Sequence, residues 1–309
     1  MADELDIQAA PHSSELNMIL GWRQWADAGS VSSGLPQYLV QQTKAQKIGA
    51  IRPDGFYIFQ VPGTHDLVRP VVKFEQGLPK TLQASQNELY FAGNDERGTV
   101  ILIGDEPHLD IERYCTAILD LAKRWSVRKI IGLGGIYGEV PFDKERLITG
   151  IYSLPALKDE MVRLAVSLSD YEGGASIGSY LCKRAGEMSL SYQGLYALVP
   201  AYEFTEGEEG GNSLRLENDF SAWLSVMQRL NYLLKLDFDL TDLEARSREL
   251  VEVVNSKVDE VDQAAPQLGI RETLNRISSS FTEVTFNPLD EVWEEELKRL
   301  MDKFDLDDQ

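Results

Sequence analysis

The sequence predicts an α/β protein: a three-layer sandwich with a mostly parallel central sheet, followed by an all-helical C-terminal extension. Three observations support this fold class. Strand patterns alternate with helical patterns from residue 16 to about residue 203, which is typical of a sheet covered by helices on both faces. Residues 99–133 read as strand, helix and strand, which favours a parallel pair joined by a right-handed crossover. Beyond residue 205 the apolar residues follow a helical period.

The sandwich is expected to begin with a short apolar strand over Leu16–Leu20. A serine, Ser30 or Ser32, is a suitable cap for the next helix, which runs to about Thr43. A second strand follows over Lys47–Ile51. Residues 56–92 are rich in strand-forming residues and are divided by turn sequences.

The centre of the sandwich is predicted to be strand Thr99–Gly104, helix Asp110–Trp125 and strand Lys129–Leu133. The last of these strands is apolar and β-branched without polar alternation, as expected for a strand covered on both faces. Glycines at 132, 134, 135 and 138 predict a glycine loop where it ends, the edge at which open α/β sheets place ligand crevices. A tight crossing without any ligand explains the same glycines equally well.

The later elements follow from the same reasoning. We expect a strand over Leu147–Ser153, a helix over Pro155–Leu168, a second glycine loop over Tyr171–Gly178, a helix over Ser176–Met188 and a strand over Leu195–Pro200. Residues 205–213 read as a linker. Helices are then expected over Asp219–Leu234, Leu240–Gln263 and Asp290–Phe304. The predicted domains are therefore an α/β core, residues 1–205, and an acidic helical C-terminal domain, residues 206–309.

The charge of the chain is acidic and unevenly spread. The formal net charge is −20, of which −14 falls on residues 206–309, with 25 Asp and Glu against 11 Lys and Arg. This balance argues against binding to nucleic acid or to an anionic membrane surface. It is compatible with a basic protein partner for the extension, although acidic surfaces also serve solubility.

Composition also indicates the compartment. The two cysteines, Cys115 and Cys182, have no spacing that suggests a zinc site or a disulfide framework, and both fall inside predicted helices. The N-terminal residues resemble no secretory signal, and no apolar run is long enough to span a membrane. We expect a cytoplasmic protein without a metal or cofactor.

One motif suggests a serine nucleophile. Gly174-Ala175-Ser176-Ile177-Gly178 fits the G-x-S-x-G pattern and precedes a helix. A nucleophilic serine needs a base, however, and no histidine follows His108. Ser176 as the cap of the next helix is the simpler explanation. The glycines at 132–138 also lack the spacing that dinucleotide binding requires.

Candidate catalytic and binding residues lie at the predicted strand ends. His108, with Asp105 and Glu106, follows strand 99–104, so Glu106 and His108 are acid or base candidates, and Asp27 follows the first strand. Hydrogen-bonded helix caps are the common alternative for such residues. Candidate ligand-binding residues come from the first strand end and the glycine segments: Trp22, Arg23, Gly134, Gly135, Gly174 and Ser176.

Four segments in this order resemble the proteasome assembly chaperone family of the second type: Gly21-Trp22 with Asp27-Ala28-Gly29, Ile51-Arg52-Pro53-Asp54, Gly104-Asp105-Glu106-Pro107, and Gly132-Leu133-Gly134-Gly135. The similarity covers about residues 16–204, and the extension resembles bacterial, chiefly actinobacterial, members of unknown function. The resemblance implies a nucleoside phosphorylase-like sandwich, homo-oligomers with a trimer favoured, and protein binding. It implies no catalytic residues. The hydrophobic–tyrosine–any-residue tail of archaeal members is missing from residues 304–309, so docking to a proteasome by that tail is not expected.

Two functions remain open from the sequence. The favoured hypothesis is a non-enzymatic, homo-oligomeric interaction or assembly-chaperone-like protein whose acidic extension contacts a protein partner. The alternative is a nucleoside phosphorylase-like or hydrolase-like enzyme, or a small-molecule binder, that uses the glycine segments at the strand ends. A concave, polar pocket formed by those segments would favour the alternative.

Overall fold

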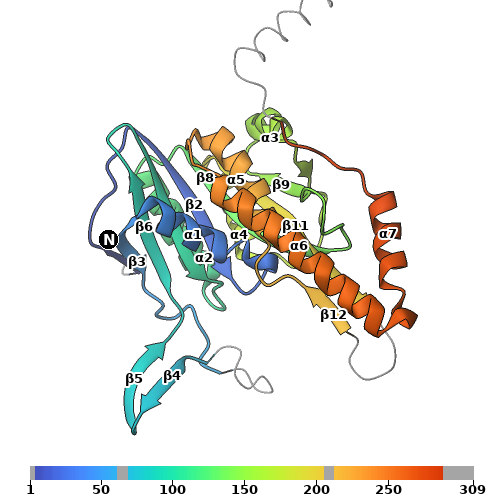
Figure 1. The fold of residues 1–309 in the computed structure, drawn as a ribbon. Helices are drawn as coiled ribbons and strands as arrows, with labels where there is room; N and C mark the ends of the chain where they lie inside the picture. Colours follow the sequence, from blue (N-terminus) through green and yellow to red (C-terminus); the bar gives the residue numbers. More distant parts are fainter. Residues whose placement is uncertain (1–3, 61–68, 205–211, 288–309) are drawn as a thin grey trace, which may run out of the picture.

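A computed structural model describes residues 4–60, 69–204 and 212–287 (Figure 1). Its main feature is a large mixed sheet with helices on both faces, which confirms the predicted fold class. The strand order across the sheet is β1 (Leu5–Ile7), β3 (Gln46–Ile51), β6 (Asn87–Gly93), β7 (Arg97–Asp105), β2 (Glu15–Arg23), β8 (Lys129–Gly138), β11 (Tyr192–Phe204), β9 (Ile148–Tyr152) and β10 (Ser167–Leu168).

The parallel part of the sheet is its centre. Strands β7, β2, β8 and β11 are all parallel to their neighbours in this group. On one side β6 is antiparallel to β7, and on the other β9 is antiparallel to β11. A short strand, β12 (Asn212–Arg215), also pairs antiparallel with β11. The carboxyl ends of β2, β7 and β8 therefore meet at one edge, which we call the carboxyl edge.

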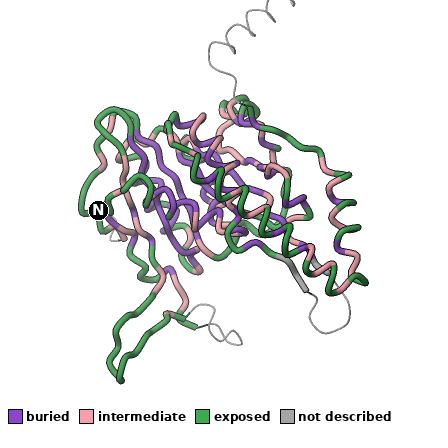
Figure 2. The backbone as a smooth tube through the Cα atoms, viewed as in Figure 1, coloured by how far each residue is buried: buried purple, intermediate pink, exposed green. Residues whose placement is uncertain are grey.

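Two hydrophobic cores fill the space between the sheet and its two helical layers. Along β2, Ile19 contributes to one core while Met18 and Leu20 contribute to the other, because alternate side chains of a strand point to opposite faces. The first core includes α1 (Gly34–Thr43), α5 (Phe220–Leu234), α6 (Thr241–Ala264) and α7 (Ile270–Ser280). The second includes α2 (Ile111–Arg124) and α4 (Ile177–Glu187). Figure 2 shows the buried central strands between these layers.

The predicted glycine loop after Leu133 is wrong, because β8 continues as a regular strand to Gly138. Its partner β11 stays in parallel register with it from Tyr192 to Pro200. The glycines make room for neighbours: a side chain on Gly132 would collide with the Tyr192 ring, and one on Gly134 with the Tyr196 ring. These tyrosines follow the glycines by about 60 residues in the sequence, so the strand's continuation could not be read from the glycine run alone.

The helices agree with the predictions except in two regions. Helix α7 forms over residues 270–280, where no helix was expected. Helices α5 and α6 coincide with the predicted 219–234 and 240–263 to within one residue at each end. Residues 155–168, predicted as one helix, form instead a 3-10 turn, the short helix α3 (Lys158–Arg163) and β10. Ala165, with a left-handed φ of 50°, separates α3 from β10. The predicted helix 290–304 lies outside the described residues.

The start of α5 is held by a buried ion pair. Arg146 and Asp219 are only 1% and 0% exposed, and their side chains meet at 2.7 Å between Nε and Oδ2. Asp219 Oδ1 also accepts hydrogen bonds from the backbone N–H groups of Ser221 and Ala222, which caps the helix. The Arg146 guanidinium also donates to the carbonyls of Pro141 and Lys144. Helix α5 also packs in the first core together with the sheet. The predicted domain boundary at residue 205 stays a prediction.

A hairpin of two strands, β4 (Val71–Glu75) and β5 (Leu78–Gln83), projects from the body of the protein (Figure 1). Every residue from 71 to 83 is exposed (Figure 2). The two strands pair only with each other in the described chain.

Among the described residues, no helix has both the length and the apolar character needed to cross a membrane.

We predict that Arg146→Met will lower the free energy of unfolding by about 3–5 kcal/mol, because it leaves the Asp219 carboxylate buried without its counter-ion. The matched control is Arg246→Met, which breaks an exposed pair with Asp242 in α6 and should cost less than about 1 kcal/mol. Chemical denaturation at neutral pH measures both changes. Equal effects of the two substitutions would contradict the structural role of the buried pair.

Candidate functional site

The carboxyl edge brings together most of the predicted site residues. At its centre, Arg23 at the end of β2 forms a two-pronged ion pair with Asp105 at the end of β7. Arg23 Nε lies 2.6 Å from Oδ1, and Nη2 lies 3.0 Å from Oδ2. Asp105 is buried and its Oδ2 also accepts a hydrogen bond from the backbone N–H of Gln86. Because Asp105 already holds this arginine, Arg23 is anchored to the edge rather than free to follow a ligand.

Asp27 follows β2 and anchors the turn that leads into α1. Its Oδ1 accepts hydrogen bonds from the backbone N–H groups of Ser32, at 3.0 Å, and Ser33, at 2.9 Å. Burial raises the pKa of Asp27 from 3.8 to about 6, against the lowering effect of its hydrogen bonds with Ser33 and Ser32 and of the Arg23 charge. The predicted helix cap by Ser30 or Ser32 is wrong, because Ser33 holds the N-cap position of α1 and no side chain makes a capping hydrogen bond there.

Glu106 connects two loops of the same edge. Its Oε1 accepts a hydrogen bond of 2.7 Å from the backbone N–H of Ile177, the first residue of α4. Burial raises its pKa, and hydrogen bonds from the backbone of Ile177 and Trp25 oppose that shift. Ser176 caps α4, accepting from the Ser179 N–H at 3.2 Å, as the simpler interpretation of the G-x-S-x-G motif predicted.

His108 is half-buried beside this edge. Its Nδ1 accepts from the backbone N–H of Ile58 at 3.2 Å, and its Nε2 lies 3.4 Å from Gln24 Oε1. The ring also packs edge-on against Tyr57, whose hydroxyl oxygen lies 2.8 Å from Asn87 Oδ1 and 2.8 Å from the carbonyl oxygen of Asp105 and shares its one proton between them. His108 is thus held by loop contacts, and no carboxylate is among its described partners.

The two tryptophans of the first strand end have different environments. Trp22 is buried and donates from Nε1 to the Tyr114 hydroxyl at 2.8 Å, so it packs in the core. Trp25 is 62% exposed. It lies between Gln24 and Ala26, which have positive φ angles of 93° and 46°. Such angles raise the conformational energy of residues that have a side chain. The turn that exposes Trp25 to solvent is therefore strained.

The predicted glycine contacts fall into two groups. Gly134 and Gly135 lie within β8, where Gly134 faces the Tyr196 ring and Gly135 faces the Ala28 carbonyl. The Gly135 N–H donates to the carbonyl of Ala26 at 2.7 Å, which ties the Asp27 turn to the sheet. Gly174, in contrast, lies in an exposed loop with open space around its Cα. Gly174 therefore differs in packing from the glycines of β8, and the role of these glycines in ligand binding stays a prediction.

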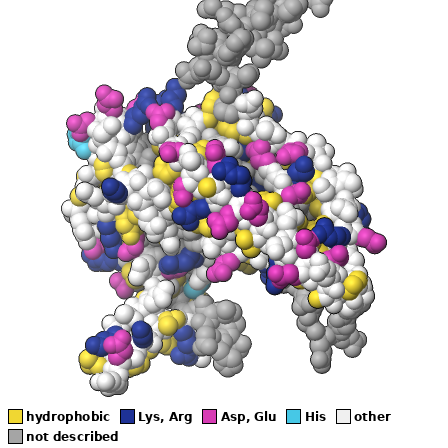
Figure 3. Space-filling model, viewed as in Figure 1, with side chains coloured by type: hydrophobic (Ala, Val, Ile, Leu, Met, Phe, Trp, Pro, Cys, Tyr) yellow, Lys and Arg dark blue, Asp and Glu magenta, His cyan; other side chains and the backbone are white. Residues whose placement is uncertain are grey.

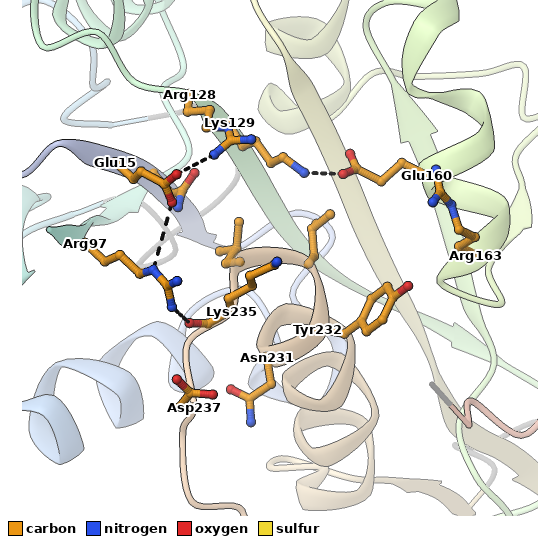
Figure 4. A pocket seen from close by; sticks show the side chains of 13 residues that line it. Glu15, Arg97, Arg128, Lys129, Glu160, Arg163, Asn231, Tyr232, Lys235 and Asp237 are labelled. Carbon is orange, nitrogen blue, oxygen red and sulfur yellow. Dashed lines mark hydrogen bonds and ion pairs between the residues drawn. The ribbon is translucent and has the colours of Figure 1, made fainter. Parts of the chain in front are cut away.

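The carboxyl edge is chemically a set of anchored carboxylates. Asp27, Asp105 and Glu106 all accept hydrogen bonds from backbone N–H groups of neighbouring loops. In the part of the chain that the structure describes, no group of three or more His, Cys, Asp or Glu is placed to hold a metal ion. A cavity of about 820 Å³ lies at the other end of the strands, lined by residues such as Glu15, Arg97 and Lys129. No candidate residue predicted from the sequence lines that cavity (Figure 4), because open α/β sheets usually bind ligands at the carboxyl ends of their strands.

The fold and this edge define a three-layer α/β protein whose strand-end polar residues join loops to one another. The sequence model of the PAC2 family matches residues 21–258. The chain belongs to the PAC2 family. No curated protein matches it.

Solved structures similar to this chain share its fold. A PAC2 family protein from Streptomyces avermitilis is 22% identical, with a TM-score of 0.66 over 84% of this chain and 99% of that one. A protein of unknown function from Corynebacterium glutamicum is 17% identical, with a TM-score of 0.69 over 94% and 95%. An archaeal proteasome activator from Pyrococcus furiosus is 20% identical, with a TM-score of 0.57 over 82% and 97%.

The raised pKa of Asp27 predicts a pH dependence of stability. Because the folded chain binds this proton more tightly than the unfolded chain, the contribution is complete below pH 3.8 and is lost as the pH rises through about 6. Relative to Asp27→Asn, the wild type should lose on the order of 2 kcal/mol of unfolding free energy between pH 4 and pH 7. Denaturation curves of both proteins across this range measure it. Parallel pH profiles would contradict the shift.

The two kinds of glycine predict opposite results. Gly135→Ala should cost about 2 kcal/mol or more, because its methyl group would meet the Ala28 backbone, which cannot rotate away. Gly174→Ala has open space and should change the free energy of unfolding by less than about 0.5 kcal/mol. Thermal and chemical denaturation compare the two. If Gly135→Ala were as stable as Gly174→Ala, close packing would not be the reason for glycine in β8.

Proposed function

We propose that this chain is a non-enzymatic, cytoplasmic protein-binding scaffold that acts as a homo-oligomer, with a trimer favoured. The observation that carries the proposal is the projecting β4–β5 hairpin. Similar structures include a proteasome-assembly chaperone homologue from Mycobacterium tuberculosis, 19% identical with a TM-score of 0.66 over 78% of this chain and 94% of that one. Assembly chaperones act by binding other proteins. By analogy, we propose that this chain also acts by binding proteins.

Exposed apolar side chains lie on both faces of the hairpin, Val71 and Leu78 on one and three more on the other. Val72 and Phe74 alternate along β4, and Leu82 pairs directly with Val72, so the three side chains share a face. They are 45%, 57% and 67% exposed, respectively. A lone two-stranded hairpin is at best marginally stable in water. Its exposed apolar side chains therefore favour an interface that covers them.

A second copy of the same chain is the occupant that the charges favour. The hairpin carries Lys73 and Lys80 against one carboxylate, Glu75, whereas the whole chain has a net charge of −20. A slightly basic arm is complementary to the acidic body of another copy. The hairpin leaves the body next to the carboxyl edge, between Phe56 and Gln86, and exposed apolar side chains, including Trp25, Ile136 and Tyr137, are found at the same edge.

A projecting hairpin that binds a different surface on the next copy also favours a ring-shaped oligomer. When one surface of each copy binds a different surface of the next, the contact is head-to-tail, and it closes into a cyclic oligomer if the rotation permits. A trimer is the smallest such ring beyond a pair. The hairpin thus supplies one surface, and the apolar residues of the carboxyl edge supply the other.

Helix α6 is the surface we propose for a separate protein partner. It carries seven acidic and three basic residues over Thr241–Ala264, and most of them are exposed. Val253, on the same helix, is 59% exposed. A basic partner surface suits this face. The alternative of a nucleoside phosphorylase-like enzyme has less support, because tyrosines occupy the space beside the β8 glycines on which it depended.

We predict that the wild-type chain has three times its 34.7 kDa mass in multi-angle light scattering at micromolar concentration. The double substitution Phe74→Ser and Leu82→Ser should shift the mass to that of one chain, because it removes apolar area from the hairpin face without touching either core. The measurement is made on the full chain at several concentrations.

The matched control is Val253→Ser, which removes a similarly exposed apolar side chain from α6. It should leave the mass unchanged. A monomeric wild type would overturn the homo-oligomer, and an unchanged mass for the hairpin variant would move the interface elsewhere. Circular dichroism of the hairpin variant should match the wild type, since the substituted residues lie at the surface.

A further inference from the structure

An exposed tryptophan lies on a strained turn at the carboxyl edge. Trp25 follows β2 and is 62% exposed, whereas Trp22 and Trp223 are 3% and 6% exposed. On either side of it, Gln24 and Ala26 have φ angles of 93° and 46°. Backbone strain of this kind persists only where the surrounding structure imposes it, and it is concentrated at functional positions. The Trp25 side chain is what this turn presents to solvent.

Hydrogen bonds from two directions hold the turn in this conformation. The Glu106 carboxylate accepts one from the Trp25 backbone and one, at 2.7 Å, from the Ile177 N–H, so it joins the turn to the start of α4. The Ala26 carbonyl accepts a hydrogen bond of 2.7 Å from the Gly135 N–H in β8. The tryptophan is therefore presented from a fixed backbone. A group that is already held in place loses less conformational entropy when it binds a partner.

A second apolar side chain, Ile136 of β8, extends the exposed surface at this edge. It is 43% exposed. Because alternate residues of a strand share a face, Ile136 is on the same face as Gly134, whose Cα approaches the Tyr196 ring beside α4. The turn that carries Trp25 is joined to the start of α4 as well. Both apolar side chains therefore belong to the α4 side of the edge, and we call them the tryptophan patch.

The β4–β5 hairpin complements this patch in charge as well as in apolar character. Lys73 and Lys80 share one carboxylate, Glu75, at 3.7 and 3.8 Å, so residues 71–83 keep a positive charge. At the edge, Glu106 is a partly exposed carboxylate, and Glu139 is exposed just after β8 ends. A lysine placed over an indole ring adds a cation–π attraction. Opposite charges around an apolar centre favour the hairpin as the occupant of the patch.

We propose that Trp25 is the anchor of the contact between copies of this chain: it packs against the Phe74 face of the next copy's hairpin, and Glu106 positions it. This inference rests on the proposed homo-oligomer and adds which side chain supplies most of the binding energy. Tryptophan is enriched among the few residues that dominate the energy of an interface. Within one chain every residue from 71 to 83 is exposed, so the hairpin and the patch are both open to a second copy.

Analytical ultracentrifugation of the full chain over a range of concentrations tests the anchor. Trp25→Ala should raise the concentration at which half of the chains dissociate by at least about thirtyfold. The control is Val162→Ala, which shortens a 58% exposed side chain on α3, far from the hairpin in Figure 1, and should leave that concentration unchanged. Because Trp25 is exposed, its variant should keep the circular dichroism of the wild type.

The positioning role of Glu106 has a separate readout. Glu106→Ala releases the turn, so it should weaken the oligomer about tenfold when Trp25 is present and have no further effect in the Trp25→Ala background. Glu106→Gln, which keeps one accepting oxygen, is the milder variant for the same cycle. Equal effects in the two backgrounds would mean that Glu106 acts on the fold alone, and its positioning role would be wrong.

The results separate this inference from the proposed function. Suppose that the wild type is oligomeric and that the hairpin variant with Phe74→Ser and Leu82→Ser is monomeric. If Trp25→Ala then dissociates at the same concentration as the wild type, the oligomer stands and the anchor is wrong. A monomeric wild type would overturn both proposals.

Discussion

The buried contact between Arg146 and Asp219 organises much of this structure, because it fixes α5 on the sheet at the point where the site loops begin. Asp219 also reaches the turn after Asp27: its backbone N–H donates to the Gly29 carbonyl at 3.0 Å. The Trp223 indole donates to the same carbonyl at 2.9 Å. Gly29 has a φ of 60°, a conformation natural to glycine. Direct hydrogen bonds to the Gly29 carbonyl therefore connect α5 to the turn at the carboxyl edge.

The two ends of the parallel strands have opposite chemical character. At the carboxyl edge, carboxylates such as Asp105 and Glu106 are already occupied by backbone N–H groups and by Arg23. At the amino ends, basic residues outnumber the carboxylates around an open volume. Figure 3 shows charges of both signs spread over the visible face, so a local excess of one sign needs a specific arrangement. The polar groups at one strand end are thus bound to one another, whereas those at the other end surround a solvent-filled space.

The sequence was sufficient to predict the fold class, most strands and the positions of α5 and α6, because these depend on local periodicity. It also placed Asp27, Glu106 and His108 correctly at strand ends. It failed where the answer depends on distant residues. The glycines of β8 are explained by Tyr192 and Tyr196, and the cavity of about 820 Å³ at the amino ends of the strands is formed by elements more than 100 residues apart. The raised pKa of Asp27 also depends on burial by distant residues, which no pattern in the neighbouring sequence indicates.

The two cysteines have a practical consequence. Cys115 in α2 and Cys182 in α4 are both buried in the second core, and burial raises the pKa of each thiol to about 12. Only the thiolate reacts readily with alkylating reagents, so both are inert in the native protein. A fluorophore or spin label attached to a cysteine introduced on the hairpin would therefore report from that position alone, with the native thiols left in place.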